Sequence, residues 1–165
     1  MSDLGAAAVS ALQSQGLTIA VAESLTGGLL MASLIAVPGA SRVVRGGVVA
    51  YATEIKASLL GVQSELLAEF GPVHPEVARQ MAGGVRALFA VDGDPADIGI
   101  STTGVAGPGI PGGHRAGLAY VGLSMGGETR VFTLSLHGSR EAIRTAVVSE
   151  ALTELSRWLG VVETA

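Results

Sequence analysis

The 165-residue sequence has no cysteine, few aromatic residues and few charges. The absence of cysteine excludes disulfides, thiolate metal sites and cysteine nucleophiles. Charged residues make up only 15% of the sequence, and the formal net charge is −4. Nucleic-acid binding depends on clustered Lys and Arg, and no such cluster occurs, so nucleic acid is not expected as a partner.

Long apolar runs are also missing. None approaches the ~18 residues of a membrane-spanning helix, and residues 1–16 lack the positive region of a signal peptide. Leu4, Ala8 and Leu12 instead recur at a spacing of four, which predicts an amphipathic helix. We therefore expect a cytoplasmic protein without membrane association. Its length and its 48% hydrophobic residues predict one globular domain over residues 1–165.

The apolar pattern alternates between strand and helix spacing. Helical stretches separate the first three predicted strands, which favours parallel pairing, and Gly126-Gly127 joins the last two as an antiparallel hairpin. The fold class is therefore α/β, a three-layer α/β/α domain with a mixed, mainly parallel sheet and a late antiparallel hairpin. The predicted strands cover residues 18–22, 42–51, 97–103, 117–125 and 128–136. After the N-terminal helix, the predicted helices begin at or near residues 27, 53, 64, 75 and 139.

A serine follows the first predicted strand in the stretch AESLTGG, residues 22–28. Ser24 falls where the apolar strand gives way to a helix opened by two glycines. Such a corner exposes a side chain at the end of a sheet and leaves the first N–H groups of the helix for an anion or oxyanion. Serine is also a favoured helix N-cap. The residues alone leave Ser24 as either a helix cap or a nucleophile.

A glycine-rich loop, residues 104–113, follows the third predicted strand. It has GxGxxG spacing from Gly107 to Gly112, but prolines interrupt it and a strand follows, so it is not a dinucleotide-binding fingerprint. Its glycines either let backbone amides approach a small anionic or amide-bearing ligand or form a flexible connection. Because ligands collect at the carboxyl ends of parallel strands, we expect this loop to lie near Ser24.

Lys56 lies in the first turn of a predicted helix that Thr53 would cap. There the positive end of the helix macrodipole opposes its ammonium group. Burial at this position would lower the pKa of the lysine, and a neutral lysine can act as a general base. The alternative is a solvated lysine. Tyr51 ends the preceding strand, where its phenol can relay a proton or form a structural hydrogen bond.

The three histidines give no sign of a metal site. His74, His114 and His137 are far apart, and none belongs to a pair with metal-ligand spacing. His74 precedes Pro75, an arrangement typical of a helix N-cap. We expect neither a metal nor a cofactor.

Several stretches together resemble the CinA C-terminal domain family, in the same order and over nearly the whole chain. They are AESLTGG at 22–28, PGASRVVRGG at 38–47, GGVVAYATEIKASLLGV at 46–62, TTGVAGPG at 102–109 and GSREAIR at 138–144. Members of that family are nicotinamide mononucleotide deamidases, which hydrolyse the carboxamide and release ammonia. The resemblance therefore implies a metal-independent serine amidohydrolase that returns nicotinamide nucleotide to NAD synthesis.

The resemblance also implies the site residues. The family uses a serine with a tyrosine and a lysine, which correspond to Ser24, Tyr51 and Lys56. Neutral Lys56, helped by Tyr51, would take the Ser24 proton while Ser24 attacks the carboxamide carbon. The oxyanion donors would be backbone N–H groups near Thr26, Gly27 and Gly28. The phosphate and ribose would lie along the loop that carries Thr103, Gly104, Gly107 and Gly109.

Some positions depart from the family pattern. Members commonly have asparagine where this chain has Thr53, and lysine-proline where it has Arg115-Ala116. These departures keep two alternatives open: a non-catalytic nucleotide-sensing or competence-associated interaction module, and a serine amidase for another small amide. The apolar composition and the resemblance also predict a homodimer.

Overall fold

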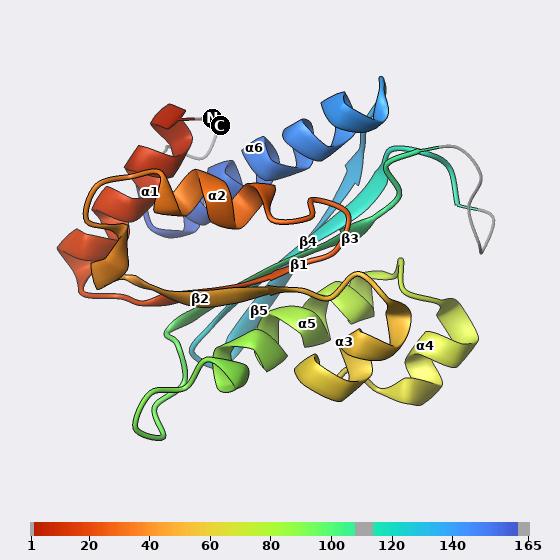
Figure 1. Cartoon of the computed structure of the whole chain (residues 1–165), viewed down its shortest axis with the longest axis horizontal. Helices are drawn as coiled ribbons and strands as arrows, with labels where there is room; N and C mark the ends of the chain where they lie inside the picture. The colour runs from red at the N-terminus through yellow and green to blue at the C-terminus, as the bar shows by residue number, and fades with distance from the viewer. Residues whose placement is uncertain (1, 108–113, 162–165) are drawn as a thin grey trace.

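A computed structural model describes residues 2–107 and 114–161 of the chain. Figure 1 shows a twisted sheet between two layers of helices, so the predicted three-layer α/β fold is confirmed. Within these two segments, no helix combines the length and the apolar character needed to cross a membrane.

Each of the first three strands is preceded by one or more helices. In the described segments the strands are β1 (Ile19–Glu23), β2 (Val44–Val49), β3 (Ile98–Gly104), β4 (Leu118–Met125) and β5 (Glu128–Ser135). The helices are α1 (Ser2–Gln15), α2 (Leu29–Ile35), α3 (Thr53–Leu60), α4 (Ser64–Phe70), α5 (Pro75–Leu88) and α6 (Arg140–Trp158), with a short 3-10 helix at Ala40–Arg42.

The sheet is mixed, with strand order β2-β1-β3-β4-β5. β1 pairs in parallel with both β2 and β3, whereas the β3-β4 and β4-β5 pairings are antiparallel. Parallel strands need crossover connections, and α2 and then α3 to α5 supply them. The register between β1 and β2 shifts between the pair of Ile19 with Val44 and the pair of Ala20 with Gly46, as at a β-bulge. The carboxyl end of β1 therefore lies between those of two parallel neighbours.

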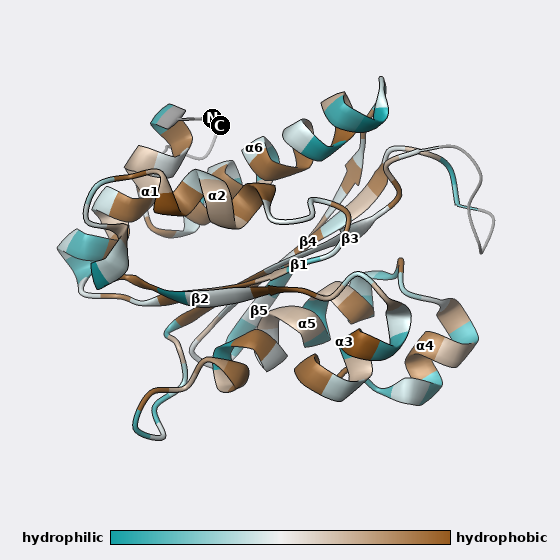
Figure 2. Ribbon diagram, in the orientation of Figure 1, coloured by the Kyte–Doolittle hydropathy of each residue, from teal (hydrophilic) through white to brown (hydrophobic). Residues whose placement is uncertain are grey.

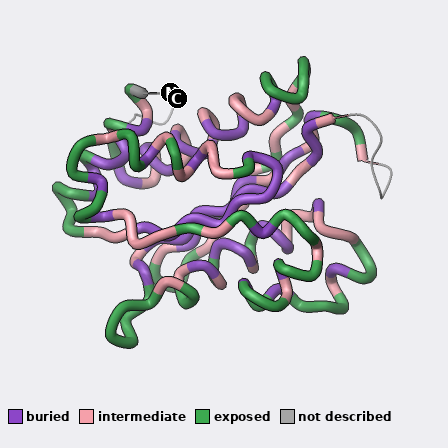
Figure 3. The backbone as a smooth tube through the Cα atoms, in the orientation of Figure 1, coloured by how far each residue is buried: buried purple, intermediate pink, exposed green. Residues whose placement is uncertain are grey.

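β1 is buried on both faces and feeds two hydrophobic cores. Ile19 and Val21 belong to the core shared with α1, α2 and α6, whereas Ala20 and Ala22 belong to the core shared with α3, α4 and α5. This division follows from the two-residue period of a strand. Figure 3 shows the buried backbone concentrated in the sheet, and Figure 2 shows hydrophobic and hydrophilic residues alternating along α6.

α5 packs directly on β3 and β4 because glycines leave room for its backbone. A Cβ atom on Gly99 would lie 1.9 Å from the Ala82 carbonyl oxygen, and one on Gly122 would lie 2.4 Å from the Ala78 oxygen. The Ser101 hydroxyl also donates to the Ala78 oxygen at 2.7 Å. This close contact fixes β3, whose last residues border the candidate site.

The helices begin at or near the predicted residues, but one predicted cap is wrong. His74 caps α5 through its side chain, as predicted, and Ser139 caps α6 in the same way. The predicted cap Thr53 is wrong, because Ala52 holds the cap position in an extended conformation and Thr53 is the first helical residue. No side chain therefore caps α3.

Candidate active site at the end of strand β1

Ser24 is the first residue after β1. Its backbone N–H donates to the Thr102 carbonyl oxygen on β3 at 3.0 Å. On the β2 side, the Ala50 N–H donates to the Glu23 oxygen at 2.8 Å. Ser24 is thus held between the carboxyl ends of two strands, the usual place for a ligand in an α/β sheet.

The N-terminus of α2 is occupied by the carboxylate of Glu23. Its Oε2 accepts hydrogen bonds from the N–H groups of Gly28 at 3.0 Å and Leu30 at 3.1 Å, and its Oε1 accepts from Met31 at 2.9 Å. Glu23 is only 1% exposed. A carboxylate is favoured there by the helix dipole and by the unpaired N–H groups. Ser24 is consequently not the cap of α2, whose N-cap residue is Gly28.

This arrangement changes the prediction for the oxyanion donors. The Gly27 N–H donates to the Ser24 oxygen at 3.1 Å, and the Gly28 N–H donates to Glu23. Both groups are used within the protein, so the prediction that they face the substrate is wrong. Thr26 is fully buried, and its hydroxyl pairs with that of Thr102 at 2.7 Å.

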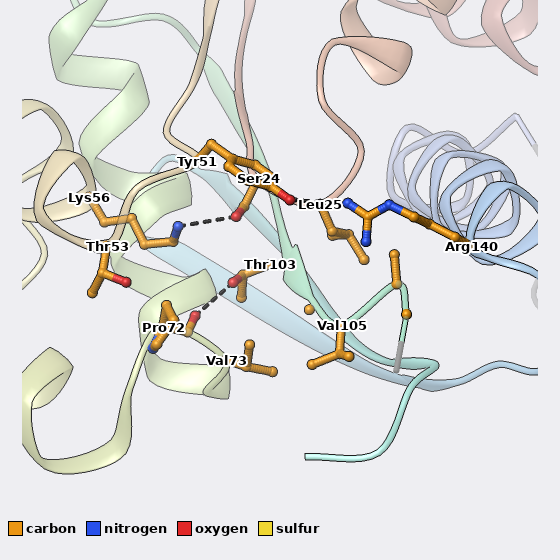
Figure 4. Close-up of a pocket in the computed structure, with 13 residues that line it drawn as sticks. Ser24, Leu25, Tyr51, Thr53, Lys56, Pro72, Val73, Thr103, Val105 and Arg140 are labelled. Atoms are coloured by element: carbon orange, nitrogen blue, oxygen red, sulfur yellow. Dashed lines mark hydrogen bonds between the residues drawn. The ribbon is translucent and has the colours of Figure 1, made fainter. Parts of the chain in front are cut away.

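A cavity of about 360 Å³ opens beside Ser24 (Figure 4). Six of the predicted site residues line it: Ser24, Tyr51, Lys56, Thr103, Gly104 and Gly107. Thr26, Gly27 and Gly28 do not, and Gly109 lies outside the described residues. Leu25, Thr53, Pro72, Val73, Val105, Ala106 and Arg140 complete the lining. The structure therefore brings the predicted serine, tyrosine and lysine to one cavity.

Lys56 is the single lysine of the sequence, and its side chain is 1% exposed. Its Nζ lies 3.1 Å from the Ser24 Oγ and donates to the Ala50 carbonyl oxygen at 2.7 Å. Burial lowers its pKa from 10.5 to about 8, against an opposing effect of the Glu54 carboxylate. The lowered pKa makes the neutral form of this lysine far more populated near pH 7 than in an ordinary lysine, and a neutral amine at this distance can accept the Ser24 proton.

Tyr51 and Arg140 meet on another wall of the cavity. Arg140 Nη2 donates to the Tyr51 hydroxyl at 3.0 Å, and Tyr51 is 62% exposed. Figure 4 shows the Tyr51 hydroxyl directed toward the guanidinium group. Among the described residues, no hydrogen bond joins this hydroxyl to Ser24 or Lys56, so the geometry does not support a direct proton relay. It places a phenol and a cation where a ligand can reach them.

Arg140 is a site residue that the sequence reasoning missed. It is the first residue of α6, directly after the Ser139 cap. A cation at that position opposes the helix dipole, which is the signal that singled out Lys56. The same test applied to every helix start would have identified Arg140.

Two hydrogen-bonded connections complete the walls. The Thr103 hydroxyl donates to the Pro72 oxygen at 2.6 Å, which ties the segment between α4 and α5 to the end of β3. Arg144 on α6 donates through Nε to the Leu25 oxygen and through Nη2 to the Thr26 oxygen, each at 2.9 Å. Both connections hold loops that border Ser24.

Relatives of known sequence share most of this chain. A CinA-like protein from Gemmatimonas aurantiaca is 44% identical over 157 residues, which cover 94% of this chain and 35% of that protein. A relative from Shouchella clausii is 49% identical over 138 residues, which cover 83% of this chain and 32% of that relative. The chain spans about a third of the length of the curated relatives it matches.

Solved structures share the whole fold. Competence damage-inducible protein A from Klebsiella pneumoniae superposes with a TM-score of 0.90 at 32% identity, with 98% of each chain covered. A competence/damage inducible protein from Agrobacterium tumefaciens superposes with a TM-score of 0.88 at 31% identity, covering 96% of this chain and 94% of that one. The family model for the CinA C-terminal domain matches residues 1–159. The chain therefore belongs to the CinA C-terminal domain family.

Proposed function

We propose that this chain is a serine amidohydrolase that converts nicotinamide mononucleotide to nicotinate mononucleotide and ammonia. The observation that carries the proposal is the 3.1 Å contact between Lys56 Nζ and Ser24 Oγ beside a cavity. A serine is a weak nucleophile unless a base takes its proton, and a buried lysine with a lowered pKa is such a base. The sequence resemblance to nicotinamide mononucleotide deamidases supplies the substrate.

In the first half of the reaction, Ser24 Oγ bonds to the carboxamide carbon while its proton passes to Lys56 Nζ. The carbonyl π electrons move to the oxygen and create a tetrahedral oxyanion. When the oxyanion collapses, the carbon–nitrogen bond breaks, and Lys56 returns the proton to the departing ammonia. In the second half, water adds to the acyl-enzyme ester with Lys56 as base and releases the carboxylate product and Ser24.

The opposite wall suits the phosphate of a nucleotide. Arg140 presents a guanidinium group at the cavity, and guanidinium groups bind phosphate oxygens in a bidentate manner. The Tyr51 hydroxyl already accepts one N–H of that group, which limits the orientations of the guanidinium. We therefore propose that Arg140 and Tyr51 bind the nucleotide while Ser24 and Lys56 act on its amide.

The test is ammonia release from nicotinamide mononucleotide by the purified chain, without added metal and in the presence of EDTA. Ser24→Ala is expected to abolish release, because it removes the nucleophile. The control is Ser58→Ala, which alters an exposed serine on α3 and leaves release unchanged. Ammonia release that persists in Ser24→Ala would contradict the serine mechanism.

Calorimetry and a panel of other amide substrates, alongside the ammonia assay, separate the alternatives. Nucleotide binding by calorimetry without any product would favour a non-catalytic nucleotide-sensing or interaction module. Turnover of nicotinamide or another small amide in preference to the nucleotide would favour a serine amidase with a different substrate. Nucleotide turnover that depends on Ser24 would support the proposed reaction over both.

A further inference from the structure

We propose that Arg144 is a positioning residue that orients the Leu25 N–H as the oxyanion donor next to Ser24. This inference rests on the proposed function, since it concerns the oxyanion of that reaction. It replaces the Gly27 and Gly28 donors that the structure shows to be engaged elsewhere. Arg144 itself does not line the cavity and acts through the backbone.

The first observation is the pair of bonds from Arg144 to consecutive carbonyls. Its Nε donates to the Leu25 oxygen and its Nη2 to the Thr26 oxygen, both at 2.9 Å. Gly27 leaves room for this contact, because a Cβ atom there would lie 3.2 Å from Arg144 Nη2. One planar guanidinium group thus holds two successive peptide planes of the loop after Ser24.

The second observation is a chain of two rigid peptide groups. The Thr26 oxygen and the Gly27 N–H are opposite ends of one planar trans peptide, so the bond to Arg144 directs the Gly27 N–H. That N–H donates to the Ser24 oxygen at 3.1 Å. The Ser24 oxygen and the Leu25 N–H are in turn opposite ends of the Ser24–Leu25 trans peptide. The hydrogen bond from the Gly27 N–H to the Ser24 oxygen therefore fixes the direction of the Leu25 N–H.

The third observation is the position of Leu25. It follows Ser24 directly and lines the cavity, whereas Thr26, Gly27 and Gly28 do not. Within the two described segments, no protein acceptor pairs with the Leu25 N–H. The N–H of the residue after a nucleophile is a common oxyanion donor where a strand turns into a helix. Leu25 is therefore the loop residue that both lines the cavity and has an N–H without a protein acceptor among the described residues.

The charge of Arg144 also suits this role. Its guanidinium group withdraws electron density from the two carbonyls that it holds, and it adds positive potential behind the loop where the oxyanion develops. A positioning group of this kind acts on the transition state more than on bound substrate. It therefore changes kcat more than KM.

The experiment compares Arg144→Ala with Arg157→Ala, a matched control on the same helix that removes an ion pair with Glu154. Ammonia release, thermal unfolding and the reaction of Ser24 with a fluorophosphonate are measured for both variants. In the last reaction, Ser24 Oγ bonds to phosphorus, fluoride leaves and Lys56 takes the proton. The developing negative charge on the phosphoryl oxygen draws on the same donor as the amide reaction.

We expect Arg144→Ala to lower kcat and the labelling rate by about 10²-fold, the usual effect of losing one oxyanion donor. KM should change by less than about threefold, and Arg157→Ala should retain wild-type rates. Added guanidinium chloride at millimolar concentration should restore part of the lost kcat in Arg144→Ala only, because the free ion can occupy the vacated site.

Other outcomes overturn one proposal or both. If Arg144→Ala keeps kcat and labelling rate within about twofold of wild type, the positioning role is wrong while the serine mechanism stands. A loss of rate that only follows a lowered melting temperature, without guanidinium rescue, also overturns it. If the wild-type chain neither releases ammonia nor labels at Ser24, the proposed function fails and this inference fails with it.

Discussion

The helices that follow the parallel strands β1 and β2 begin in opposite ways. At α2, the buried Glu23 carboxylate accepts three backbone N–H groups, so the helix end is neutralised. At α3, no side chain caps the first turn, and the buried amine of Lys56 lies there instead. The first corner has a buried carboxylate at the helix start, as the helix dipole favours, whereas the second has a buried amine there and only the exposed carboxylate of Glu54 in its first turn. The serine and the lysine of the proposed reaction thus meet at the corner whose helix start has no side-chain cap.

The largest effect should come from removing the amine at the α3 corner. Lys56→Met keeps an unbranched apolar stem but has no base, and we expect kcat for ammonia release to fall by about 10³-fold or more. Circular dichroism should show an unchanged fold. Retention of more than a tenth of wild-type kcat would show that another group takes the Ser24 proton.

Removing the Glu23 carboxylate at the α2 corner should lower the free energy of unfolding. Glu23→Ala leaves the N–H groups of Gly28, Leu30 and Met31 without their acceptor, and we expect the free energy of unfolding to fall by about 3 kcal/mol. Urea denaturation measures the change. Glu65→Ala, at an exposed position in the first turn of α4, is the control and should change stability by less than about 0.5 kcal/mol. Equal effects of the two substitutions would remove the contrast between the corners.

Removing the Lys56 amine at the α3 corner should raise the free energy of unfolding, the opposite of the effect expected for Glu23→Ala. The unfolded chain binds more protons than the folded chain between the two pKa values of Lys56, about 8 and 10.5. Stability from this group therefore rises with pH across that window and is lowest below it. We expect Lys56→Met to raise the unfolding free energy by about 2 kcal/mol at pH 7, with the gain shrinking toward pH 10.5. A destabilised Lys56→Met at pH 7 would contradict this reading.

The pH dependence of the reaction should follow the same group. In the proposed reaction only neutral Lys56 takes the serine proton, so kcat/KM should rise about tenfold per pH unit below a midpoint near the pKa of about 8 and level off above it. Since Lys56 is the single lysine, reductive methylation with ¹³C-formaldehyde gives an NMR signal for its titration that is distinguishable from the N-terminal amine. A midpoint that NMR places near 10.5 would show that burial does not tune this amine.

The smallest effect should come from the exposed tyrosine. Tyr51→Phe removes the acceptor of the Arg140 hydrogen bond but leaves the Ser24-Lys56 contact intact. We expect KM for the nucleotide to rise about threefold and kcat to change by less than about twofold. A loss of kcat comparable with that of Lys56→Met would instead support a proton relay through the Tyr51 hydroxyl.

Local patterns in the sequence determined the layered α/β fold, because strand and helix periods, glycine pairs and caps are short-range signals. The same local physics marked Lys56, since a cation in the first turn of a helix breaks a rule that neighbouring residues alone define. It also brought Ser24 and Thr103 to one edge, because parallel strands must end together. Family resemblance added Tyr51 to this group.

Tertiary structure decided what those residues contact. The AESLTGG stretch offers both Ser24 and Glu23 to the start of α2, and only packing shows that buried Glu23 takes the helix N–H groups and frees Ser24 for Lys56. It likewise pairs Tyr51 with Arg140 and joins Arg144 to the loop after Ser24 across more than a hundred residues of chain. Such choices are set by burial and by distances between remote segments, which one-dimensional patterns do not contain.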